Sequence, residues 1–127
     1  MKILDANAIL RYLLKDMEEQ ASEVADAVRE GAMTTPEVIA EVVYVLTGVY
    51  GLTRSDVSWY IHCTLLDIRV DNTRALRYAI GVFNQTSLDF VDCLMVAYHK
   101  VLGMDILTFD KKLNHTLERE LKLHQSI

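Results

Sequence analysis

The sequence predicts an α/β fold, a three-layer α/β/α domain with a mostly parallel central sheet. Short apolar runs alternate with longer amphipathic runs, which is the pattern of strands joined by helices. Because parallel strands need helical crossovers, such a sheet is covered by helices on both faces. The 127 residues include one proline and five glycines, and no repeat or linker marks a boundary. We therefore expect a single domain over residues 1–127.

The chain up to Asp71 is expected to hold three strands and four helices. Met1–Asp5 is a short apolar run that ends in an acid, which predicts a buried strand. Thr35 followed by Pro36 predicts a helix start, and valines then follow at helical spacing to about Gly51. Further strands are expected at Ala32–Thr34 and Asp67–Asp71, and further helices at Asn7–Leu14, Glu18–Glu30 and Thr53–Leu65.

Two helices are expected in the second half, one running to about Asn84 and the other covering Phe90–Leu102. The residues that can cap or close these helices are Asn72 or Thr73, Ser87 or Asp89, and Gly103. A strand at Asp105–Thr108, a helical piece after it and a last strand near Leu123 complete the prediction.

Composition excludes several classes of protein. Half of the residues are hydrophobic (51%) and about a quarter are charged (24%), which excludes a disordered chain. No apolar run approaches the roughly 20 residues that cross a bilayer. Met1–Asp5 has one lysine and then an acid, unlike a signal peptide, so we expect a cytoplasmic protein. Cys63 and Cys93 stand alone in apolar stretches, which predicts buried thiols and no zinc or redox motif.

The net charge of −5, from 13 basic and 18 acidic residues, is unusual for a protein that binds nucleic acid. If four of the acids held two divalent ions, the effective charge would be −5 + 4, or −1. The balance argues against a tight, nonspecific grip on long nucleic acid by this chain alone. The basic residues also cluster along the chain, as Arg69, Arg74 and Arg77 in one group and Lys111, Lys112, Arg119 and Lys122 in another.

Four acids occupy positions where a carboxylate is unexpected. Asp5 and Asp110 closely follow expected strands, and ligands of parallel sheets bind beyond the carboxyl ends of the strands. Glu41 and Asp92 are each the only charged side chain of an apolar helical stretch. We expect such helices to be buried, and no basic residue three or four positions away can pair with either acid. Because a buried, unpaired carboxylate is costly, a bound cation is expected beside it.

Carboxylates alone suit a hard cation such as Mg²⁺ or Mn²⁺, which can activate water and stabilise the leaving oxygen of a phosphodiester. The chain has no GxSxG, HExxH, P-loop or GxGxxG motif for another chemistry. Ordinary roles exist for three of the acids. Asp5 could cap a helix, Asp92 could be a first-turn residue that the helix dipole favours, and Asp110 could lie in a turn. Glu41 has no capping role in mid-helix. The four together, in this order, favour a metal site.

Four segments of the chain together resemble the signature segments of PIN domains. They are DANAILRYLL from Asp5, AEVVYVL from Ala40, DFVDCLMVA from Asp89 and ILTFDKK from Ile106. The resemblance covers essentially the whole chain. It is greatest to the VapC-like toxins, which are the ribonuclease halves of toxin–antitoxin pairs.

The resemblance implies a metal-dependent endoribonuclease that uses one or two Mg²⁺ or Mn²⁺ ions, acts as a toxin, and is silenced by a small antitoxin protein. It also implies a homodimer, and the apolar helices Val38–Tyr50 and Phe90–Tyr98 independently predict self-association. Asn7 and Thr108 match polar positions that orient acids or water. The implied catalytic, metal-binding acids are Asp5, Glu41, Asp92 and Asp110.

Two alternative functions stay open. One is a catalytically inactive PIN-like RNA-binding or assembly module, against which the intact set of four acids argues. The other is a phospho-accepting receiver domain, which needs paired acids after its first strand, where only Asp5 stands. Among single residues, Asp89 could be an auxiliary ligand or, more simply, a helix cap. Arg11 could contact a phosphate or pair with a site acid, and His115 could touch substrate or lie solvated at a helix end.

Overall fold

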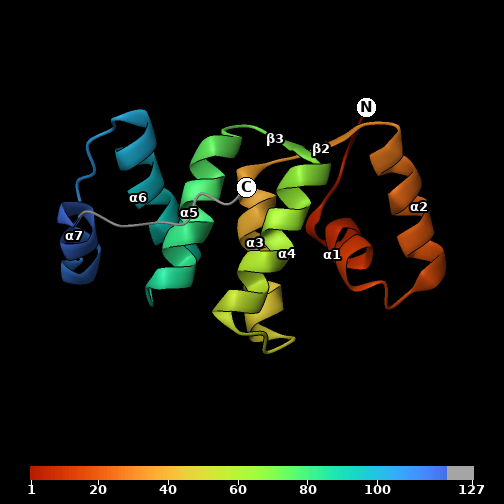
Figure 1. Cartoon of the computed structure of the whole chain (residues 1–127), viewed down its shortest axis with the longest axis horizontal. Coiled ribbons are helices and arrows are strands. Elements are labelled where there is room, and N and C mark those ends of the chain that lie inside the picture. The colour runs from red at the N-terminus through yellow and green to blue at the C-terminus, as the bar shows by residue number, and fades with distance from the viewer. Residues whose placement is uncertain (120–127) are drawn as a thin grey trace. The chain divides into compact units, whose positions relative to one another are not determined.

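The computed structural model describes residues 1–119, which form seven helices and three strands (Figure 1). Contacts within the chain divide it into two compact units, Met1–Thr73 and Arg74–Ile127, which we call the N-terminal unit and the C-terminal unit. In chain order the elements are β1 Lys2–Ile3, α1 Ala6–Leu14, α2 Glu18–Arg29, β2 Ala32–Thr34, α3 Pro36–Gly48, α4 Arg54–Asp67, β3 Arg69–Val70, α5 Thr73–Gln85, α6 Phe90–Leu102 and α7 Lys111–Glu118.

The strands of the N-terminal unit form one parallel sheet in the order β1-β2-β3. Past β1, the Leu4 amide donates to the Met33 carbonyl at 2.8 Å, and the buried Thr34 hydroxyl donates to the Leu4 carbonyl at 2.8 Å. These two hydrogen bonds extend the contact between β1 and β2 beyond the paired residues of the two strands. Because the sheet is parallel, all three carboxyl ends lie at one edge, where the sequence places Asp5.

Helices of the N-terminal unit start where their sequences predict. Thr35 caps α3 by accepting from the Val38 amide at 3.2 Å, and Pro36 occupies the first helical position. Thr53 caps α4 in the same way. In Figure 1, α1 and α2 lie side by side, and α1 also contacts α3. The fully buried side chains of this unit include Ile9, Ile39, Leu46, Val57 and Ile61.

In the C-terminal unit the described elements are helices. Phe83 on α5 meets Phe90 on α6 edge to face, with ring centroids 6.0 Å apart, and both side chains are buried. Gly103 closes α6 in the left-handed conformation (φ +71°), which a side chain would disfavour. Cys93 is buried as expected, whereas Cys63 in the other unit is half-buried.

Helices α6 and α7 run parallel, with their starts together and their ends together. Near the starts, the Lys112 ammonium on α7 donates to the Ser87 carbonyl just before α6, at 3.0 Å. Near the ends, the Lys100 ammonium on α6 donates to the Arg119 carbonyl just after α7, at 2.9 Å. An extended segment, residues 103–110, connects the two helices.

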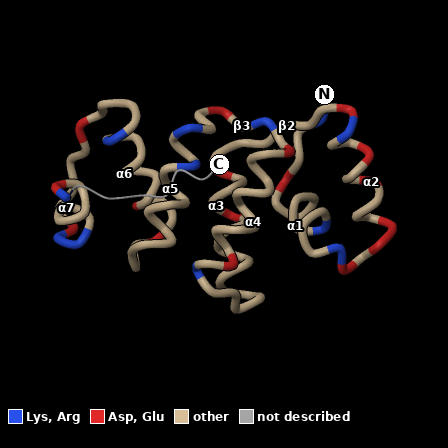
Figure 2. Tube along the Cα trace, in the orientation of Figure 1, with Lys and Arg blue, Asp and Glu red and all other residues tan. Residues whose placement is uncertain are grey.

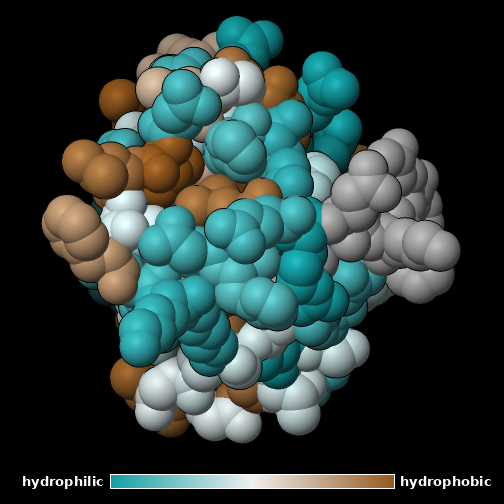
Figure 3. All heavy atoms as spheres, turned by 90° about the vertical axis from the view of Figure 1, so that its left-hand side faces the viewer, coloured by the Kyte–Doolittle hydropathy of each residue, from teal (hydrophilic) through white to brown (hydrophobic). Residues whose placement is uncertain are grey.

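The expected strand at Asp105–Thr108 is wrong, because residues 103–110 have no regular secondary structure. A strand needs a neighbouring strand for its hydrogen bonds, and the described elements of this unit are helices. Leu107 and Phe109 are 88% and 93% exposed, and Figure 3, which views the α7 side of the unit, shows hydrophobic side chains among hydrophilic ones. The strand expected near Leu123 lies outside the described residues.

The six helices predicted from Asn7 to Leu102 are confirmed within one or two residues at most ends. Strands at the first and third positions are shorter than predicted, two residues each, and both residues of β1 are exposed, so the prediction of a buried first strand is wrong. Within residues 1–119, no helix combines the length and apolar character that a membrane crossing requires.

Candidate metal centre

Asp5 follows β1 and caps α1. Its backbone is extended (φ −83°, ψ 178°), and its Oδ1 accepts a hydrogen bond from the Ala8 amide at 2.8 Å. The capping role that the sequence allowed is therefore real. It occupies one carboxylate oxygen, and the residue is exposed, so the other oxygen can bind a cation.

Glu41 is exposed, and the expectation that it would be buried is wrong. Helix α3 buries Ile39, Ala40, Val42, Val43 and Leu46, which leaves a narrow outer stripe. Glu37, Glu41, Tyr44 and Gly48 share that exposed stripe, because positions three or four apart lie on one helix face. Glu41 thus avoids the desolvation cost on which its sequence-based assignment partly rested.

The two acids of the N-terminal unit start from the same edge of the sheet. Asp5 stands directly after Leu4, and α3 starts two residues after β2, the strand paired with β1. At about 1.5 Å per residue, Glu41 lies roughly 9 Å along α3 from its cap at Thr35. The sheet therefore positions one acid at its edge and the other a short way above it.

In the C-terminal unit the acids gather at the starts of α6 and α7. Asp92 lies half-buried in the first turn of α6. Asp110 caps α7, and its Oδ1 accepts from the Leu113 amide at 2.9 Å. Because the two helices start together, their acids share one end of the helix pair. Both helix starts also present positive dipole ends, which favour negative charge there.

Asp89 occupies the capping position of α6 but makes no capping hydrogen bond with its side chain, so the simpler role expected for it is wrong. A side-chain cap would accept from the amide of Val91 or Asp92, and the carboxylate of Asp89 accepts from neither. The carboxylate of Asp89 is exposed and adds negative charge near Asp92.

The pKa of Asp92 is raised above the ordinary aspartate value. Burial is the main cause, the negative charges of Asp110 and Asp89 raise the pKa further, and the positive charge of Lys112 opposes the rise. Both raising effects penalise the ionised carboxylate. A divalent cation bound here would offset both, since it would replace lost hydration and neutralise the crowded charges.

Thr108 supports Asp110 directly. Its hydroxyl accepts from the Asp110 amide at 3.1 Å, and the Asn114 side chain donates to the Thr108 carbonyl at 2.9 Å. These contacts fix the backbone that carries Asp110, and the supporting role implied for Thr108 stays a prediction. Asn7 is exposed in the first turn of α1, beside Asp5 in sequence.

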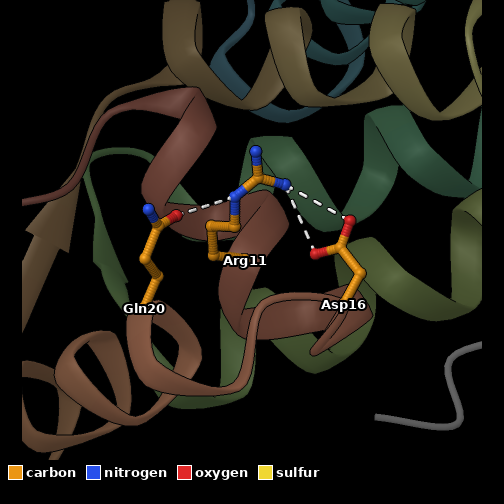
Figure 4. A network of polar contacts seen from close by, with 3 residues as sticks. All are labelled: Arg11, Asp16 and Gln20. Atoms are coloured by element: carbon orange, nitrogen blue, oxygen red, sulfur yellow. Dashed lines mark hydrogen bonds and ion pairs between the residues drawn. The ribbon is translucent and has the colours of Figure 1, made fainter.

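Arg11 does not pair with any of the four site acids. Its Nε donates to the Gln20 side chain at 3.0 Å, and its Nη1 contacts both carboxylate oxygens of Asp16 at 3.3 Å (Figure 4). The guanidinium therefore ties α1 to the turn before α2 and to α2 itself. His115 is exposed in the last turn of α7.

Lys112 is the residue of this region that sequence reasoning missed. It was counted only as one of a basic cluster, yet it contacts the Ser87 carbonyl and acts on the charge of Asp92. Its position two residues after Asp110 was the available signal. Nothing in the sequence indicated its partner, which lies 25 residues away.

Each unit carries two of the four acids, Asp5 and Glu41 in one and Asp92 and Asp110 in the other. In the part of the chain that the structure describes, no three His, Cys, Asp or Glu side chains are grouped as metal ligands. Mg²⁺ is commonly held by one or two carboxylates together with waters and substrate phosphates. The oxygen-only donors of Asp92 and Asp110, at a site where negative charge is already penalised, fit such an ion.

A family model described as PIN domain matches residues 2–117. No curated protein and no solved structure is significantly similar to the chain. The family match extends over parts of both units and includes all four acids. Together with the parallel sheet, it confirms the predicted α/β fold class.

Proposed function

The chain belongs to the PIN-domain family, and on that basis we propose that it is a metal-dependent endoribonuclease that hydrolyses RNA phosphodiester bonds. PIN domains are in general nucleases that use divalent metal ions. The proposed metal-binding and catalytic residues are Asp5, Glu41, Asp92 and Asp110, with one or two Mg²⁺ or Mn²⁺ ions as cofactor. The observation that carries the proposal is the crowding of acids at the starts of α6 and α7, expressed in the raised pKa of Asp92.

The residues of the C-terminal unit would hold and orient the reacting groups. When bound, a divalent cation lowers the pKa of water and stabilises charge on the phosphodiester. Asp110 keeps a fixed orientation because its amide and one carboxylate oxygen are both hydrogen-bonded. Asp92 has no such restraint from a cap, and its half-buried position limits its hydration. We expect products with 5′-phosphate and 3′-hydroxyl ends.

The charge distribution indicates how RNA would approach each unit. In the N-terminal unit, Glu18, Glu19, Glu23, Asp26 and Glu30 line α2 and its end, as the red segments of Figure 2 show. In the C-terminal unit, Arg74 and Arg77 are exposed one turn apart on α5. Phosphates are attracted to such arginines and repelled by the acidic helix. The net charge of −5 favours a narrow set of RNA targets over general binding.

We further propose that the protein acts in the cytoplasm as the toxin of a toxin–antitoxin pair, silenced by a small antitoxin protein. The support is the likeness of its four signature segments to those of VapC-like toxins. A homodimer is also proposed, because apolar or aromatic side chains are exposed on and just after α3 (Tyr44, Val49 and Tyr50) and on α6 (Val91). Light scattering at micromolar concentration should then give about twice the monomer mass of 14.5 kDa.

The test is metal-dependent cleavage of a mixed pool of structured and single-stranded RNAs. Cleavage should require Mg²⁺ or Mn²⁺ and stop with EDTA. Each of Asp5→Asn, Glu41→Gln, Asp92→Asn and Asp110→Asn should lower the rate about a hundredfold or more, as expected when metal positioning is lost.

Matched controls remove similar charges elsewhere. Glu37→Gln lies one turn before Glu41 on the same exposed stripe of α3, and Asp105→Asn lies in the extended segment before Asp110. Both should cleave at close to the wild-type rate. A fully active Asp92→Asn on any cleaved RNA would contradict the mechanism, and RNA binding without cleavage would favour the inactive PIN-like module.

A further inference from the structure

The starts of α6 and α7 are joined by one side-chain contact, the hydrogen bond from Lys112 to the Ser87 carbonyl. Lys112 is the second residue of α7, and Ser87 lies in the short connection between α5 and α6. Asp92 follows Ser87 by five residues and Asp110 precedes Lys112 by two. The contact therefore spans the two chain segments that carry the acids of this unit.

The acceptor of this contact is itself held in place. The Thr86 amide and hydroxyl both donate to the Val82 carbonyl, the last at 2.8 Å, and the Thr86 hydroxyl accepts from the Leu88 amide at 3.3 Å. Residues on either side of Ser87 are thus fixed to the end of α5. A lysine that reaches this carbonyl ties α7 to a rigid point and not to a free loop.

On these contacts, and resting on the nuclease function proposed above, we propose that Lys112 is a positioning residue. It clamps the start of α7 to the start of α6 and so sets the spacing between Asp92 and Asp110. The positive charge of its ammonium also acts on Asp92, whose pKa it lowers. A metal site tolerates displacements of only about 0.5 Å, so loss of the clamp should disturb it.

The molecule contains two natural controls for Lys112. Lys100 makes the same kind of bond, ammonium to backbone carbonyl, at the far ends of α6 and α7. Lys111 is the neighbouring lysine, exposed in the first turn of α7, and none of the hydrogen bonds found within residues 1–119 involves its side chain. Lys100→Met therefore removes an equivalent clamp away from the acids, and Lys111→Met removes an equivalent charge without a clamp.

The first measurement is hydrogen exchange of the backbone amides of residues 86–92, without metal or RNA. Lys112→Met should speed exchange there severalfold, whereas Lys111→Met should leave it unchanged. Lys100→Met should speed exchange only near the ends of α6 and α7. Unchanged exchange at residues 86–92 in Lys112→Met would overturn the proposal, whether or not the protein cleaves RNA.

The second measurement is Mn²⁺ binding by calorimetry, which compares two variants of equal charge. Lys112→Met should bind Mn²⁺ about fivefold or more weakly than Lys111→Met, since only the former loses the spacing of the acids. Equal affinities would overturn the proposal. If these two measurements agree with it but no RNA is cleaved by the wild type, the positioning role stands and the nuclease function fails.

The third measurement is the rate of cleavage on any RNA that the wild type cuts. Lys112→Met should lower kcat about tenfold with KM within about twofold, because the change misplaces catalytic groups and leaves RNA binding intact. Lys112→Arg, which keeps a long cationic donor, should recover most of kcat. Equal losses of kcat in Lys112→Met and Lys100→Met would assign both lysines to general stability and would contradict a positioning role.

Discussion

The two units position their acids by different means. In the N-terminal unit, a parallel sheet delivers Asp5 to its carboxyl edge, and a helix that starts at the same edge carries Glu41. In the C-terminal unit, two parallel helices with joined starts bring Asp92 and Asp110 together. The first arrangement leaves its acids exposed, and the second places Asp92 half-buried among other carboxylates. Acids at the edge of the sheet therefore ionise with little free-energy cost. At the starts of the helix pair, ionisation of Asp92 carries an electrostatic cost that a bound cation can offset.

The largest expected effect tests whether the two units are one cooperative domain. Phe90→Ala should lower the free energy of unfolding by about 3 to 5 kcal/mol, since Phe90 is buried against Phe83. Leu46→Ala in the other unit should cost about 2 to 5 kcal/mol. In urea, both variants should shift one transition, seen equally by circular dichroism and by the fluorescence of Trp59, the single tryptophan.

If Phe90→Ala shifts the circular dichroism but leaves the Trp59 midpoint unchanged, the units unfold separately. The prediction of a single domain would then be wrong, and the N-terminal and C-terminal units would be two independently folding modules.

The next effect concerns how much stability the protein loses because the ionised Asp92 is half-buried near other carboxylates. Asp92→Asn should melt higher than the wild type without metal, because it removes a penalised charge and keeps the shape. Mn²⁺ at a hundred times its dissociation constant should stabilise the wild type by about 2.7 kcal/mol, and Asp92→Asn by clearly less. Thermal melts with and without Mn²⁺ measure both quantities. A variant that is less stable without metal and keeps the full Mn²⁺ shift would exclude Asp92 as a ligand.

The pH dependence of that difference follows from its sign. Since the pKa of Asp92 is raised in the folded state, ionisation favours the unfolded chain. This destabilisation is complete above the folded-state pKa and disappears below the ordinary aspartate value of about 3.9. The metal-free advantage of Asp92→Asn should therefore be full at neutral pH and vanish near about pH 3. An advantage that grows on acidification would show the opposite shift.

A smaller effect separates capping from metal binding at Asp5. Asp5→Ala should lower stability by about 1 kcal/mol, because the Ala8 amide loses its acceptor. Asp5→Asn should retain stability, since asparagine caps about as well as aspartate. Both variants should lose cleavage activity. An active Asp5→Asn would reduce this acid to a cap and leave Glu41 as the one proposed metal-binding acid of the N-terminal unit.

The smallest effect concerns Arg11. Its partners Asp16 and Gln20 are exposed, so Arg11→Ala should cost no more than about 1 kcal/mol. The rate of RNA cleavage should stay within about twofold of the wild type. A large loss of activity with stability unchanged would support a phosphate-binding role for the Arg11 guanidinium.

Local signals were sufficient to predict the helices and the class of the sheet. Caps such as Thr35 and Thr53, and apolar residues at helical spacing, act through neighbours a few positions away, which a sequence displays directly. The assignment of Asp5 to a sheet edge was also local, because it needed only a strand followed by an acid. The roles of the four acids await the experiments above, but the placement of Asp5 after a strand, and of Asp92 and Asp110 at helix starts, follows from the same patterns.

Contacts between distant segments were not predictable in the same way. Glu41 was expected to be buried because its helix is apolar, yet the outer stripe of α3 depends on which neighbours pack against the helix. The strand at Asp105–Thr108 had a suitable composition but lacks a neighbouring strand in its unit. Likewise, the bond from Lys112 to Ser87 depends on how α6 and α7 pack, which neither segment encodes alone.

Because α6 and α7 run parallel, the segment that joins them has to run back along the whole length of α6. Helix α6 has 13 residues and is about 20 Å long, and packed helices lie about 8 to 10 Å apart. Returning from its end to the start of α7 thus requires roughly 22 Å, and the eight residues of 103–110 reach at most about 26 to 29 Å when fully extended. Six residues would reach at most about 20 to 22 Å, which leaves no slack. Apart from Gly103, Thr108 and Asp110, the residues of this exposed segment can therefore vary, whereas its length cannot shrink freely: a deletion of two residues would leave no slack and would pull Asp110 along α6, away from Asp92.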